Sequence, residues 1–494
     1  MTKLPHNLYT SAQVRDMDRV TIEEHEISGT GLMERAGSAA FNLIQQRWPE
    51  AKSIRVFCGT GNNGGDGYVI ARLAHEKKYQ TSVYQVGDAN HIQGDALAAL
   101  QRLEGAGVTV RQFSDAEDFS ETDVVVDALL GTGFEGVVRE DYQQVIDIMN
   151  QASASILAVD IPSGVNADSG CATGCAVEAD CTISFIGMKR GLMTGAAVDL
   201  CGELFFDDLR IPQDIYQKQQ AAAQVLDYEI LKTSLGKRAP AAHKGQFGHV
   251  LIVGGDFGMS GAARMAGEAA QRVGAGLVSI ATRQEHAALL SSTRPELMCH
   301  GVANAGELKP LLEKASMVAI GPGLGTSEWA EELKSEVMSC DLPLLVDADA
   351  LNLLAKEKLQ RGNWVLTPHP GEAGRLLGKD AKEIQNDRFA AVEQIVEQFG
   401  GVAVLKGAGS LIHTKDSVTG ICTEGNPGMA SGGMGDVLTG VIAGLIAQGL
   451  SIADAARLGV VMHARAADMA VVAVGERGLL ASDLMVNLRR LANP

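Results

Sequence analysis

Short apolar runs alternate with helical patterns along the first half of the chain. Five of these runs predict β-strands, at residues 53–58, 81–86, 123–129, 155–160 and 181–186. They are almost continuously apolar, which is typical of parallel strands that are buried on both faces. Helical patterns such as those at 67–78 and 91–103 lie between them. This alternation predicts a doubly wound, Rossmann-like α/β/α domain.

The second half repeats the alternation with longer helices. Its strands are predicted at residues 249–253, 277–281, 317–321, 344–346, 364–366 and 402–405. The chain ends in three predicted helices, at 433–448, 452–474 and 479–491. We therefore expect a second three-layer α/β/α domain.

A change in composition separates the two halves. Residues 212–245 are rich in Gln, Ala and Lys and show no strand pattern, so we expect a linker there. We place the boundary between residues 218 and 219, which gives domains of 1–218 and 219–494. Two domains also suit a chain of 494 residues, because single cores rarely grow beyond about 250–300 residues.

The charge and the cysteines narrow the class of protein. The chain has 42 Lys and Arg against 60 Asp and Glu, a net charge of −18, which disfavours binding to nucleic acid. Four of the eight cysteines cluster between 171 and 201 with irregular spacing and no nearby His, which indicates free thiols in a reducing cytosol. No apolar run is long enough to span a membrane. We expect a soluble cytoplasmic protein, and a homo-oligomer because such domains often assemble symmetrically.

A glycine-rich segment, residues 59–67 (GTGNNGGDG), follows the first strand. It satisfies G-x-G-x-x-G, but that pattern alone is weak evidence for a dinucleotide site, and Asp88 is poorly placed as the acidic residue of such a site. Two Asn and one Asp inside the segment offer amide and carboxylate groups to a ligand or a cation. A tight turn without a ligand remains the alternative.

Three further loops follow strand ends, at residues 127–137, 160–164 and 187–189. Ligands of open parallel sheets bind at the carboxyl ends of the strands, so we expect these loops to converge with the glycine-rich segment. Asn63, Asp127 and Ser163 offer only oxygen ligands, which suits a hard cation such as K⁺. Asp160 either caps its loop or serves as a general acid/base.

The clearest chemical motif is residues 426–436 (NPGMASGGMGD), which open a long apolar helix. Backbone amides of a glycine turn at a helix N-terminus make an anion hole, which stabilises charge on a transferring phosphoryl group. Asp436 falls in the first helical turn beside that hole, where a carboxylate can take the proton from an attacking hydroxyl. The alternative is a helix-capping Asp.

Other loops at the same predicted edge carry groups for phosphate or metal. Residues 406–410 (KGAGS) combine a cation with glycines that let the backbone approach phosphates. His369, held between two prolines in residues 367–372 (TPHPGE), favours contact with a substrate. Asp347 and Asp349 would orient Mg²⁺ through water. The chain has no P-loop and no protein-kinase signature, so phosphate chemistry must run through the GGMGD anion hole.

These motifs together resemble a known family. GGMGD, KGAGS, TPHPGE and DADALN resemble the ribokinase-like superfamily, and within it the nucleotide-dependent NAD(P)H-hydrate dehydratases. GTGNNGGDG, DALLGTGFEG and VDIPSG resemble the NAD(P)H-hydrate epimerase domain. Both sets in one chain, in this order, resemble the bacterial bifunctional NAD(P)H-hydrate repair enzymes. The resemblance covers residues 10–215 and 225–492.

The resemblance implies a metabolite-repair function. The substrate would be NADH or NADPH that has gained water across the 5,6-double bond of its nicotinamide ring (NADHX or NADPHX). The first domain would interconvert the R and S epimers with K⁺ bound, and the second would dehydrate the S epimer with Mg²⁺ and ADP, giving AMP and phosphate. No nucleic acid or membrane partner is implied. The motifs do not decide between ADP and ATP, or between NADHX and NADPHX.

The resemblance also assigns residues to both sites. Asp436 and Asp160 would be the catalytic residues. The epimerase substrate would contact Asn62, Asn63, Gly64, Gly65, Asp66, Gly131, Thr132, Gly133, Phe134, Glu135, Gly136, Val137, Tyr142 and Asp160. K⁺ would be held by Asn63, Asp127 and Ser163. The dehydratase substrate would contact Ala263, Gly323, His369 and Asp436. The nucleotide would contact Lys406, Gly407, Ala408, Gly409, Ser410 and Gly435.

Three other interpretations remain open at this stage, because a fold alone does not fix a function. The chain would be a ribokinase-like kinase of a small alcohol if its phosphorylated product were stable. The N-terminal domain would be a noncatalytic binding module if it retained a ligand without turnover. A Rossmann oxidoreductase is disfavoured by the position of Asp88.

Overall fold

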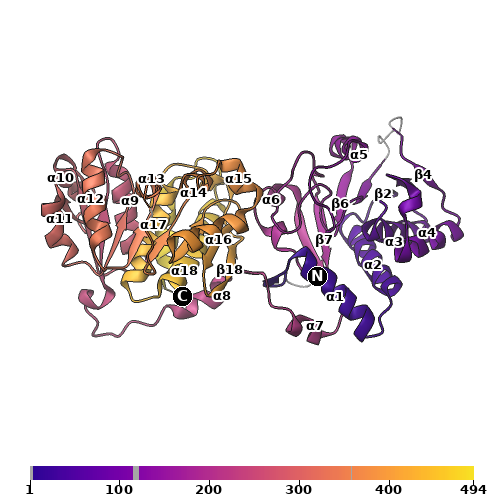
Figure 1. The fold of residues 1–494 in the computed structure, drawn as a ribbon, viewed down its shortest axis with the longest axis horizontal. Helices are drawn as coiled ribbons and strands as arrows, with labels where there is room; N and C mark the ends of the chain where they lie inside the picture. Colours follow the sequence, from indigo (N-terminus) through magenta and orange to yellow (C-terminus); the bar gives the residue numbers. More distant parts are fainter. Residues whose placement is uncertain (1–3, 115–121, 358, 494) are drawn as a thin grey trace. The chain divides into compact units, whose positions relative to one another are not determined.

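The structure is a computed structural model that describes residues 4–114, 122–357 and 359–493. The chain forms two compact units, Met1–Gln224 and Val225–Pro494 (Figure 1). Each unit is an α/β sandwich of its own, as the alternation of strands and helices predicts, and each is described separately. None of the helices in the described ranges combines the length and the hydropathy needed to cross a bilayer.

The first unit is built on a seven-stranded sheet in which all neighbouring strands are parallel. In spatial order its strands are β4 (Val110–Gln112), β3 (Gln80–Gln85), β2 (Ser53–Cys58), β5 (Val124–Ala128), β6 (Ser155–Val159), β7 (Cys181–Phe185) and β8 (Glu203–Asp207). The chain therefore starts in the middle of the sheet, moves to one edge and then returns to build the other side. This order confirms the predicted Rossmann-like fold and places a switch point between β2 and β5.

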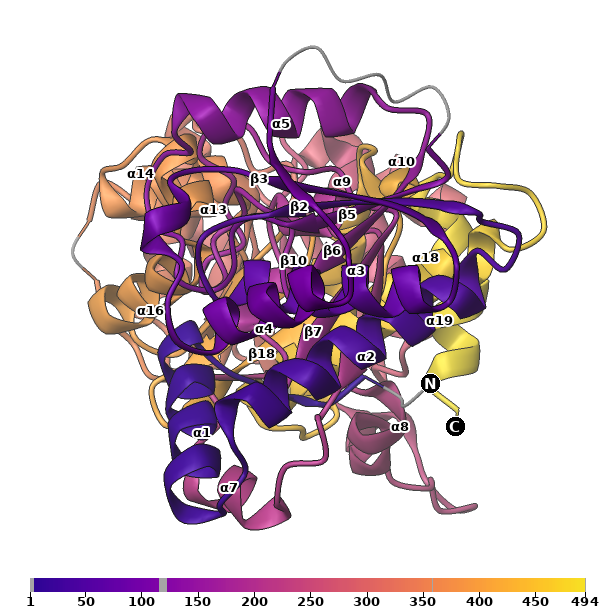
Figure 2. The same ribbon diagram turned by 90° about the vertical axis from the view of Figure 1, so that its right-hand side faces the viewer.

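Side chains alternate between the two faces of this sheet. Ile54 and Val56 belong to the core beneath α1 (Ser11–Glu24), α2 (Gly29–Arg47), α3 (Asn62–Glu76) and α4 (Gly94–Gly105), whereas Phe57 packs toward α5 (Glu140–Gln151). Figure 2 shows α5 above the strands and α3 and α4 below them. Strands that are buried on both faces explain the continuous apolar runs in the sequence.

Helix α3 begins earlier than predicted. The pattern favoured a loop over residues 59–67, but Asn62 already starts the helix, with Gly61 as its N-cap. The glycines inside the first turn allow close packing rather than a loop. An added Cβ at Gly64 would lie 2.1 Å from the carbonyl oxygen of Gly59, and one at Gly65 would lie 2.5 Å from the Met33 side chain.

The segment 212–245 is more ordered than a linker. It contains α7 (Gln213–Lys218), β9 (Ala223–Val225) and α8 (Tyr228–Leu231). The prediction that it holds no strand is therefore wrong. Strand β9 pairs antiparallel with β1 (Asn7–Leu8) near the N-terminus, and a pairing this short depends on a distant partner that no local pattern reveals.

The sheet of the second unit is mixed. In spatial order its strands are β18 (Ser417–Cys422), β17 (Ser410–Thr414), β16 (Val402–Leu405), β15 (Trp364–Leu366), β14 (Leu344–Val346), β13 (Met317–Ile320), β10 (His249–Val253), β11 (Leu277–Thr282) and β12 (Met298–Gly301). The strands from β16 to β12 run parallel, and β16, β17 and β18 form antiparallel pairs. The six predicted strands are all present, and the short or polar strands β12, β17 and β18 were missed.

Helices cover this sheet. Between β10 and β16 the chain forms α9 (Ser260–Arg272), α10 (Gln284–Thr293), α11 (Ala305–Leu312), α12 (Glu328–Ser339), α13 (Ala348–Leu354), α14 (Pro370–Leu377), α15 (Ala381–Asn386) and α16 (Arg388–Phe399). The second unit ends with α17 (Met434–Ala447), α18 (Ile452–Val471) and α19 (Leu484–Leu491). The remaining short helix, α6 (Ala197–Leu200), belongs to the first unit.

Helix α17 crosses α9 with almost no space between the two backbones, and Figure 1 shows the two helices side by side. An added Cβ at Gly440 would lie 2.0 Å from the carbonyl oxygen of Ala266, and one at Gly444 would lie 2.7 Å from that of Ala270. The two glycines therefore let α17 lie directly on α9. This packing fixes the position of the helix whose N-terminus follows the GGMGD glycines.

Replacing Gly440 by Ala should destabilise the second unit, because its Cβ would force the α9 backbone away. Overpacking of this kind typically costs about 1–3 kcal/mol, measurable by urea denaturation. The control is Gly261→Ala in the first turn of α9, where no atom lies within 4 Å of the added Cβ. That variant should be neutral or slightly more stable, because Ala favours helix. Equal stabilities of the two variants would show that the crossing does not require glycine.

Candidate active sites

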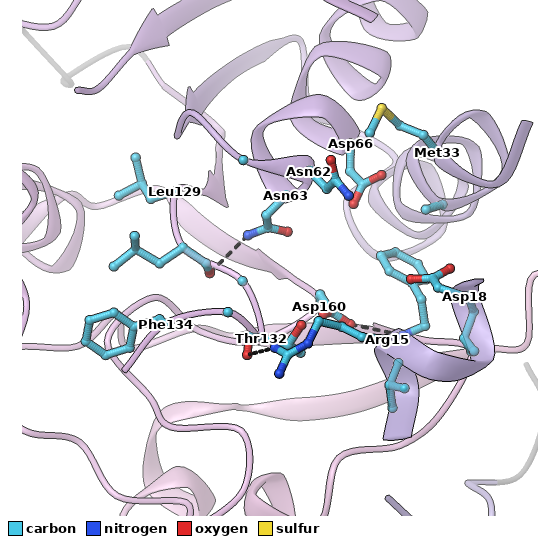
Figure 3. Close-up of a pocket in the computed structure, with 18 of the residues that line it drawn as sticks. Arg15, Asp18, Met33, Asn62, Asn63, Asp66, Leu129, Thr132, Phe134 and Asp160 are labelled. Carbon is cyan, nitrogen blue, oxygen red and sulfur yellow. Dashed lines mark hydrogen bonds between the residues drawn. The ribbon is translucent and has the colours of Figure 1, made fainter. Parts of the chain in front are cut away.

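A cavity of about 690 Å³ opens at the carboxyl ends of the strands in the first unit, a size typical of small-molecule sites. The loops after β2, β5, β6 and β7 all contribute to its wall, so they converge as the topology predicts. Figure 3 shows Asn62, Asn63 and Asp66 on one side, with Leu129, Thr132 and Phe134 on another.

Most of the predicted epimerase residues line this cavity. They are Asn62, Asn63, Asp66, Gly131, Thr132, Gly133, Phe134, Glu135, Val137, Tyr142 and Asp160. Gly64, Gly65 and Gly136 do not line it, and the first two are buried within α3. The Tyr142 hydroxyl donates a hydrogen bond to the Val86 carbonyl, 3.3 Å away.

Asp160 is held by a buried lysine. Its carboxylate forms an ion pair with Lys189, whose side chain is 1% exposed. The Lys189 ammonium also donates to the Ser184 hydroxyl and the Phe185 carbonyl, each at 3.1 Å. Asp160 has a φ of 67°, which is uncommon for a residue other than glycine and is typical of strained functional positions. The Asp160 carboxylate is therefore held at the cavity wall by a buried ion pair and an uncommon backbone conformation, neither of which a residue that only caps its loop would need.

Two further carboxyl groups face the cavity, Asp18 from α1 and Asp66 from α3 (Figure 3). Burial raises the pKa of Asp18 to about 6, partly offset by Lys189. Burial, together with the Asp160 and Asp18 carboxylates, raises the pKa of Asp66 well above its usual value. Both groups therefore bind a proton more tightly than an exposed Asp does, and Asp66 more than Asp18, beside the Asp160–Lys189 pair.

Behind the cavity, oxygen atoms gather around Asp127. The Ser163 hydroxyl donates to the Asp127 carboxylate at 2.6 Å, and Asn63 Nδ2 donates to the Leu130 carbonyl at 3.1 Å. Asn63 Oδ1 is buried and accepts no hydrogen bond from the described residues. Burial raises the pKa of Asp127 to about 6 despite its hydrogen bonds. The Leu130 carbonyl accepts hydrogen bonds from both Asn63 and Ser163, so the three predicted cation ligands are linked through one loop.

The GGMGD turn in the second unit has the geometry expected of an anion hole. Gly433 has a φ of 92° and caps α17, which begins at Met434. Asp436 lies in the first turn of this helix. Burial and the nearby Asp347 and Asp349 carboxylates raise the pKa of Asp436 to about 7, against the effect of Lys406. A general base works best with a pKa near the operating pH, so Asp436 is suited to that role.

Lys406 joins the phosphate loops to one another. Its ammonium lies 2.7 Å from Asp347 Oδ1 and 3.8 Å from Glu372 Oε2. Burial favours its neutral form, but these carboxylates raise its pKa above the usual value. An added Cβ at Gly435 would lie 3.5 Å from Lys406 Nζ. The structure therefore brings the predicted nucleotide residues Lys406 and Gly435 together. Residues 406–409 form the turn between β16 and β17, and Ser410 begins β17.

Asp347 is a partner for Lys406 rather than an open metal ligand. Its second oxygen accepts a hydrogen bond from Thr439 on α17 at 2.7 Å, while Asp349 accepts one from the Gly325 amide at 2.9 Å. Among the described parts of the chain, no three His, Cys, Asp or Glu side chains form a cluster that would hold a metal ion. Direct protein ligands for Mg²⁺ are thus few, which suits an ion held mainly by phosphates and water.

The remaining predicted residues lie on neighbouring elements. His369 caps α14, where its Nδ1 accepts a hydrogen bond from the Gly371 amide at 3.0 Å, and its side chain is half exposed. Gly323 has a φ of 58°, and an added Cβ there would lie 2.6 Å from the carbonyl oxygen of Met259 just before α9. Ala263 on α9 is fully buried.

Comparison with known proteins gives a consistent result for both units. A family model described as "YjeF-related protein N-terminus" matches residues 29–191, and one described as "NAD(P)H-hydrate dehydratase" matches residues 250–490. A bifunctional NAD(P)H-hydrate repair enzyme from Coxiella burnetii is 50% identical over 99% of both chains. The chain belongs to the family of bifunctional NAD(P)H-hydrate repair enzymes. The Escherichia coli repair enzyme is 44% identical, over 99% of this chain and 95% of its own.

The second unit has a related solved structure. A ribokinase-like superfamily protein from Enterococcus faecalis matches with a TM-score of 0.50 and 28% identity, over 56% of this chain and 96% of its own. The predicted family, the two α/β domains and the enzyme class, an epimerase joined to an NAD(P)H-hydrate dehydratase, are therefore confirmed.

Sequence reasoning missed several residues of this repair enzyme. Arg15 and Asp18 lie on α1, which precedes the first strand of the sheet. They were missed because the prediction considered only the loops that follow the carboxyl ends of strands. Arg15 Nη1 donates to the Thr132 carbonyl at 3.2 Å. Their i, i+3 spacing places them on one helix face and was the available signal. Arg388 is fully buried and donates hydrogen bonds to the Leu405 and Lys406 carbonyls, which hold the start of the KGAGS turn in position.

Proposed function

We propose that the first unit epimerises NAD(P)H hydrate and that the second unit dehydrates the S epimer by phosphorylating its C6 hydroxyl with ADP. The observation that carries the proposal is the Asp436 carboxyl. It lies in the first turn of α17 beside a glycine turn, with a pKa of about 7 and with Lys406 close by. A base, an anion hole and a phosphate-binding cation are the parts that phosphoryl transfer to a hydroxyl needs.

Dehydration then proceeds in two steps, phosphorylation of the C6 hydroxyl and elimination of the phosphate. Asp436 accepts the hydroxyl proton while the hydroxyl oxygen attacks the terminal phosphorus of ADP, and the bond from that phosphorus to AMP breaks. Phosphate is a far better leaving group than hydroxide, so the C6–O bond breaks with assistance from the ring-nitrogen electron pair. Loss of a proton from C5 restores the 5,6-double bond. The products are NAD(P)H, AMP and phosphate.

Each predicted group of the second unit has a part in this scheme. The amides at Gly432–Gly435 would bind the transferring phosphoryl group, and Lys406 with the 406–410 turn would hold the nucleotide. His369, Gly323 and Ala263 would line or shape the hydrate pocket. Mg²⁺ would neutralise phosphate charge when bound, with Asp347 and Asp349 orienting its waters.

In the first unit, the hydroxyl at C6 sits next to the ring nitrogen. Its loss as water leaves a planar cation, and water returning to the other face gives the second epimer. Asp66, whose pKa burial raises well above the usual value, would protonate the leaving hydroxyl, with Asp18 beside it. Asp160, oriented by Lys189, would take the proton from the incoming water. Tyr142 and the 131–137 loop would hold the ring and the rest of the dinucleotide.

K⁺ would bind Asn63, Asp127 and Ser163 and stabilise negative charge there. Asn63 supports this assignment, because its buried Oδ1 lacks a hydrogen bond while its Nδ2 is held by Leu130. An ion at this place would fix the turn after β5, whose next residues line the cavity.

The direct test is recovery of the reduced-nicotinamide absorbance band from a mixture of both hydrate epimers, with Mg²⁺ and K⁺ present. Complete recovery that requires ADP supports both activities. Recovery of only the S portion would remove the epimerase, and accumulation of a stable phosphorylated product would indicate a small-alcohol kinase instead.

The division at residues 218 and 219, the cytoplasmic location and the homo-oligomeric state stay predictions. Size-exclusion chromatography with light scattering measures the last of these directly.

Asp436→Ala should abolish dehydration and leave epimerisation unchanged, because the two sites lie in separate compact units. A loss of about 100-fold or more is expected for removal of a general base. Dehydration is followed by absorbance, and epimerisation by chromatography of pure R epimer without ADP. Loss of both activities would contradict the assignment of one reaction to each unit.

The rate of dehydration should fall as pH drops below 7, by about tenfold per pH unit, because Asp436 is then protonated and cannot act as a base. Asp349→Asn removes one of the carboxylates that raise this pKa, so its profile should shift to lower pH. The ionisation of ADP is the same in the assays of both proteins, so a difference between their pH profiles comes from a group on the enzyme. Asp341→Asn, which changes an exposed carboxylate in the same unit, is the control. An identical profile for Asp349→Asn would show that Asp349 does not raise the pKa of the titrating group.

Asp160→Asn should lower the epimerisation rate by about 100-fold or more, while ADP-dependent dehydration of purified S epimer stays normal. The matched control is Asp16→Asn, an exposed pair partner of Arg19 on α1. Full epimerase activity in Asp160→Asn would assign the proton transfer to another group.

A further inference from the structure

A second cavity lies at the opposite edge of the sheet in the second unit. Its volume is about 370 Å³, within the range of about 300–1,000 Å³ that small-molecule sites occupy. Its walls come from the end of α9, the segment leading into β12, the end of α19 and Arg238. Helices run antiparallel to the strands that they connect, so these segments meet at the amino edge, whereas the phosphate loops lie at the carboxyl edge.

Positive charge collects in this cavity although the chain as a whole carries −18. Four arginines and two glutamates line it, which are Arg238, Arg272, Arg294, Arg489, Glu268 and Glu296, so cations outnumber anions two to one. Arg272 and Arg294 share one buried carboxylate, that of Glu268, which also pairs with Arg264. One negative charge thus serves three guanidinium groups.

The cluster leaves hydrogen-bond donors unused. Arg294 Nε is buried and has no hydrogen-bond partner among the described residues. Arg489 forms no ion pair within the described ranges. Arg238 donates to the Gly274 carbonyl and to Gln448, both neutral groups. Converging like charges are costly, and an anion bound in the cavity would relieve their repulsion.

Helix dipoles account for part of this arrangement only. Arg272 and Arg489 each lie in the last turn of a helix, where a cation is favourable. That effect explains why each helix ends in a basic residue. The helix dipole does not explain why the ends of α9 and α19 meet around one cavity that Arg238 and Arg294 also line.

We propose that this cavity is a binding site for a phosphate-bearing small molecule, separate from the dehydratase site. Guanidinium groups bind phosphate oxygens through paired hydrogen bonds, and several of them in one cavity select for multiple negative charges. Inorganic phosphate and AMP share this chemistry. The site does not depend on the proposed reaction.

The test compares two neighbouring arginines of α19 in the full-length protein. Arg489 lines the cavity and Arg490 does not, yet both lie in the last turn of the same helix and are exposed. Phosphate binding is measured by calorimetry for Arg489→Glu and Arg490→Glu. Arg489→Glu should weaken binding by about tenfold or more, the usual effect of losing one charged hydrogen bond, and Arg490→Glu should change it less than about twofold. Any phosphate bound at the GGMGD turn contributes equally to both variants.

Arg489→Gln, which removes the charge without reversing it, replaces Arg489→Glu if that variant does not fold. Equal phosphate binding by the Arg489 and Arg490 variants would overturn the proposal. The same titration with AMP and with chloride identifies the ligand class. A stronger dependence on Arg489 with AMP than with phosphate assigns the site to nucleotides, and an equal dependence with chloride would refute the preference for phosphate.

Discussion

The second unit is organised around the buried contact between Lys406 and Asp347. Lys406 follows β16, Asp347 follows β14, and the Thr439 hydroxyl on α17 donates a hydrogen bond to the other oxygen of the Asp347 carboxylate. A buried ion pair is stable only when its remaining hydrogen bonds are satisfied. Here that requirement ties two strand ends to the helix that carries Asp436. Together with the packing of α17 on α9, this contact holds Asp436, Lys406 and the glycine turn before α17 in fixed positions relative to one another.

The same contact shapes the electrostatics of the reaction. Asp347 raises the pKa of Asp436 while Lys406 lowers it, so the base is balanced between two members of one ion pair. In the first unit, three carboxyl groups lie near a single buried lysine, and burial raises the pKa of Asp18 and Asp66 above that of an exposed Asp. In both units, burial is the main cause of the raised carboxyl pKa values, and a single lysine offsets it only in part.

Local sequence predicted the parallel core and the strand-end loops well, because continuous apolar runs and glycine-rich turns have local physical causes. The runs at 249–253, 344–346, 364–366 and 402–405 match β10, β14, β15 and β16 at both ends. Features that depend on distant partners were missed, and they include β9, the hairpin of β17 and β18, and the cavity residues of α1. The glycines of α3 misled the prediction of its start, because glycine permits close packing as well as turns.

The close crossing of α17 over α9 has a consequence for how the chemistry can vary. The glycine turn proposed to bind phosphate lies at the start of α17, and the middle of this helix rests on Ala266 and Ala270 of α9. A rigid helix moves as one body, so a small shift at the Gly440 crossing also shifts the backbone amides at the N-terminus of α17. Misplacement of a catalytic group by about 1 Å can cost about 100-fold in rate. A larger side chain on the buried side of α9 would therefore shift the turn at the start of α17 without itself approaching the nucleotide.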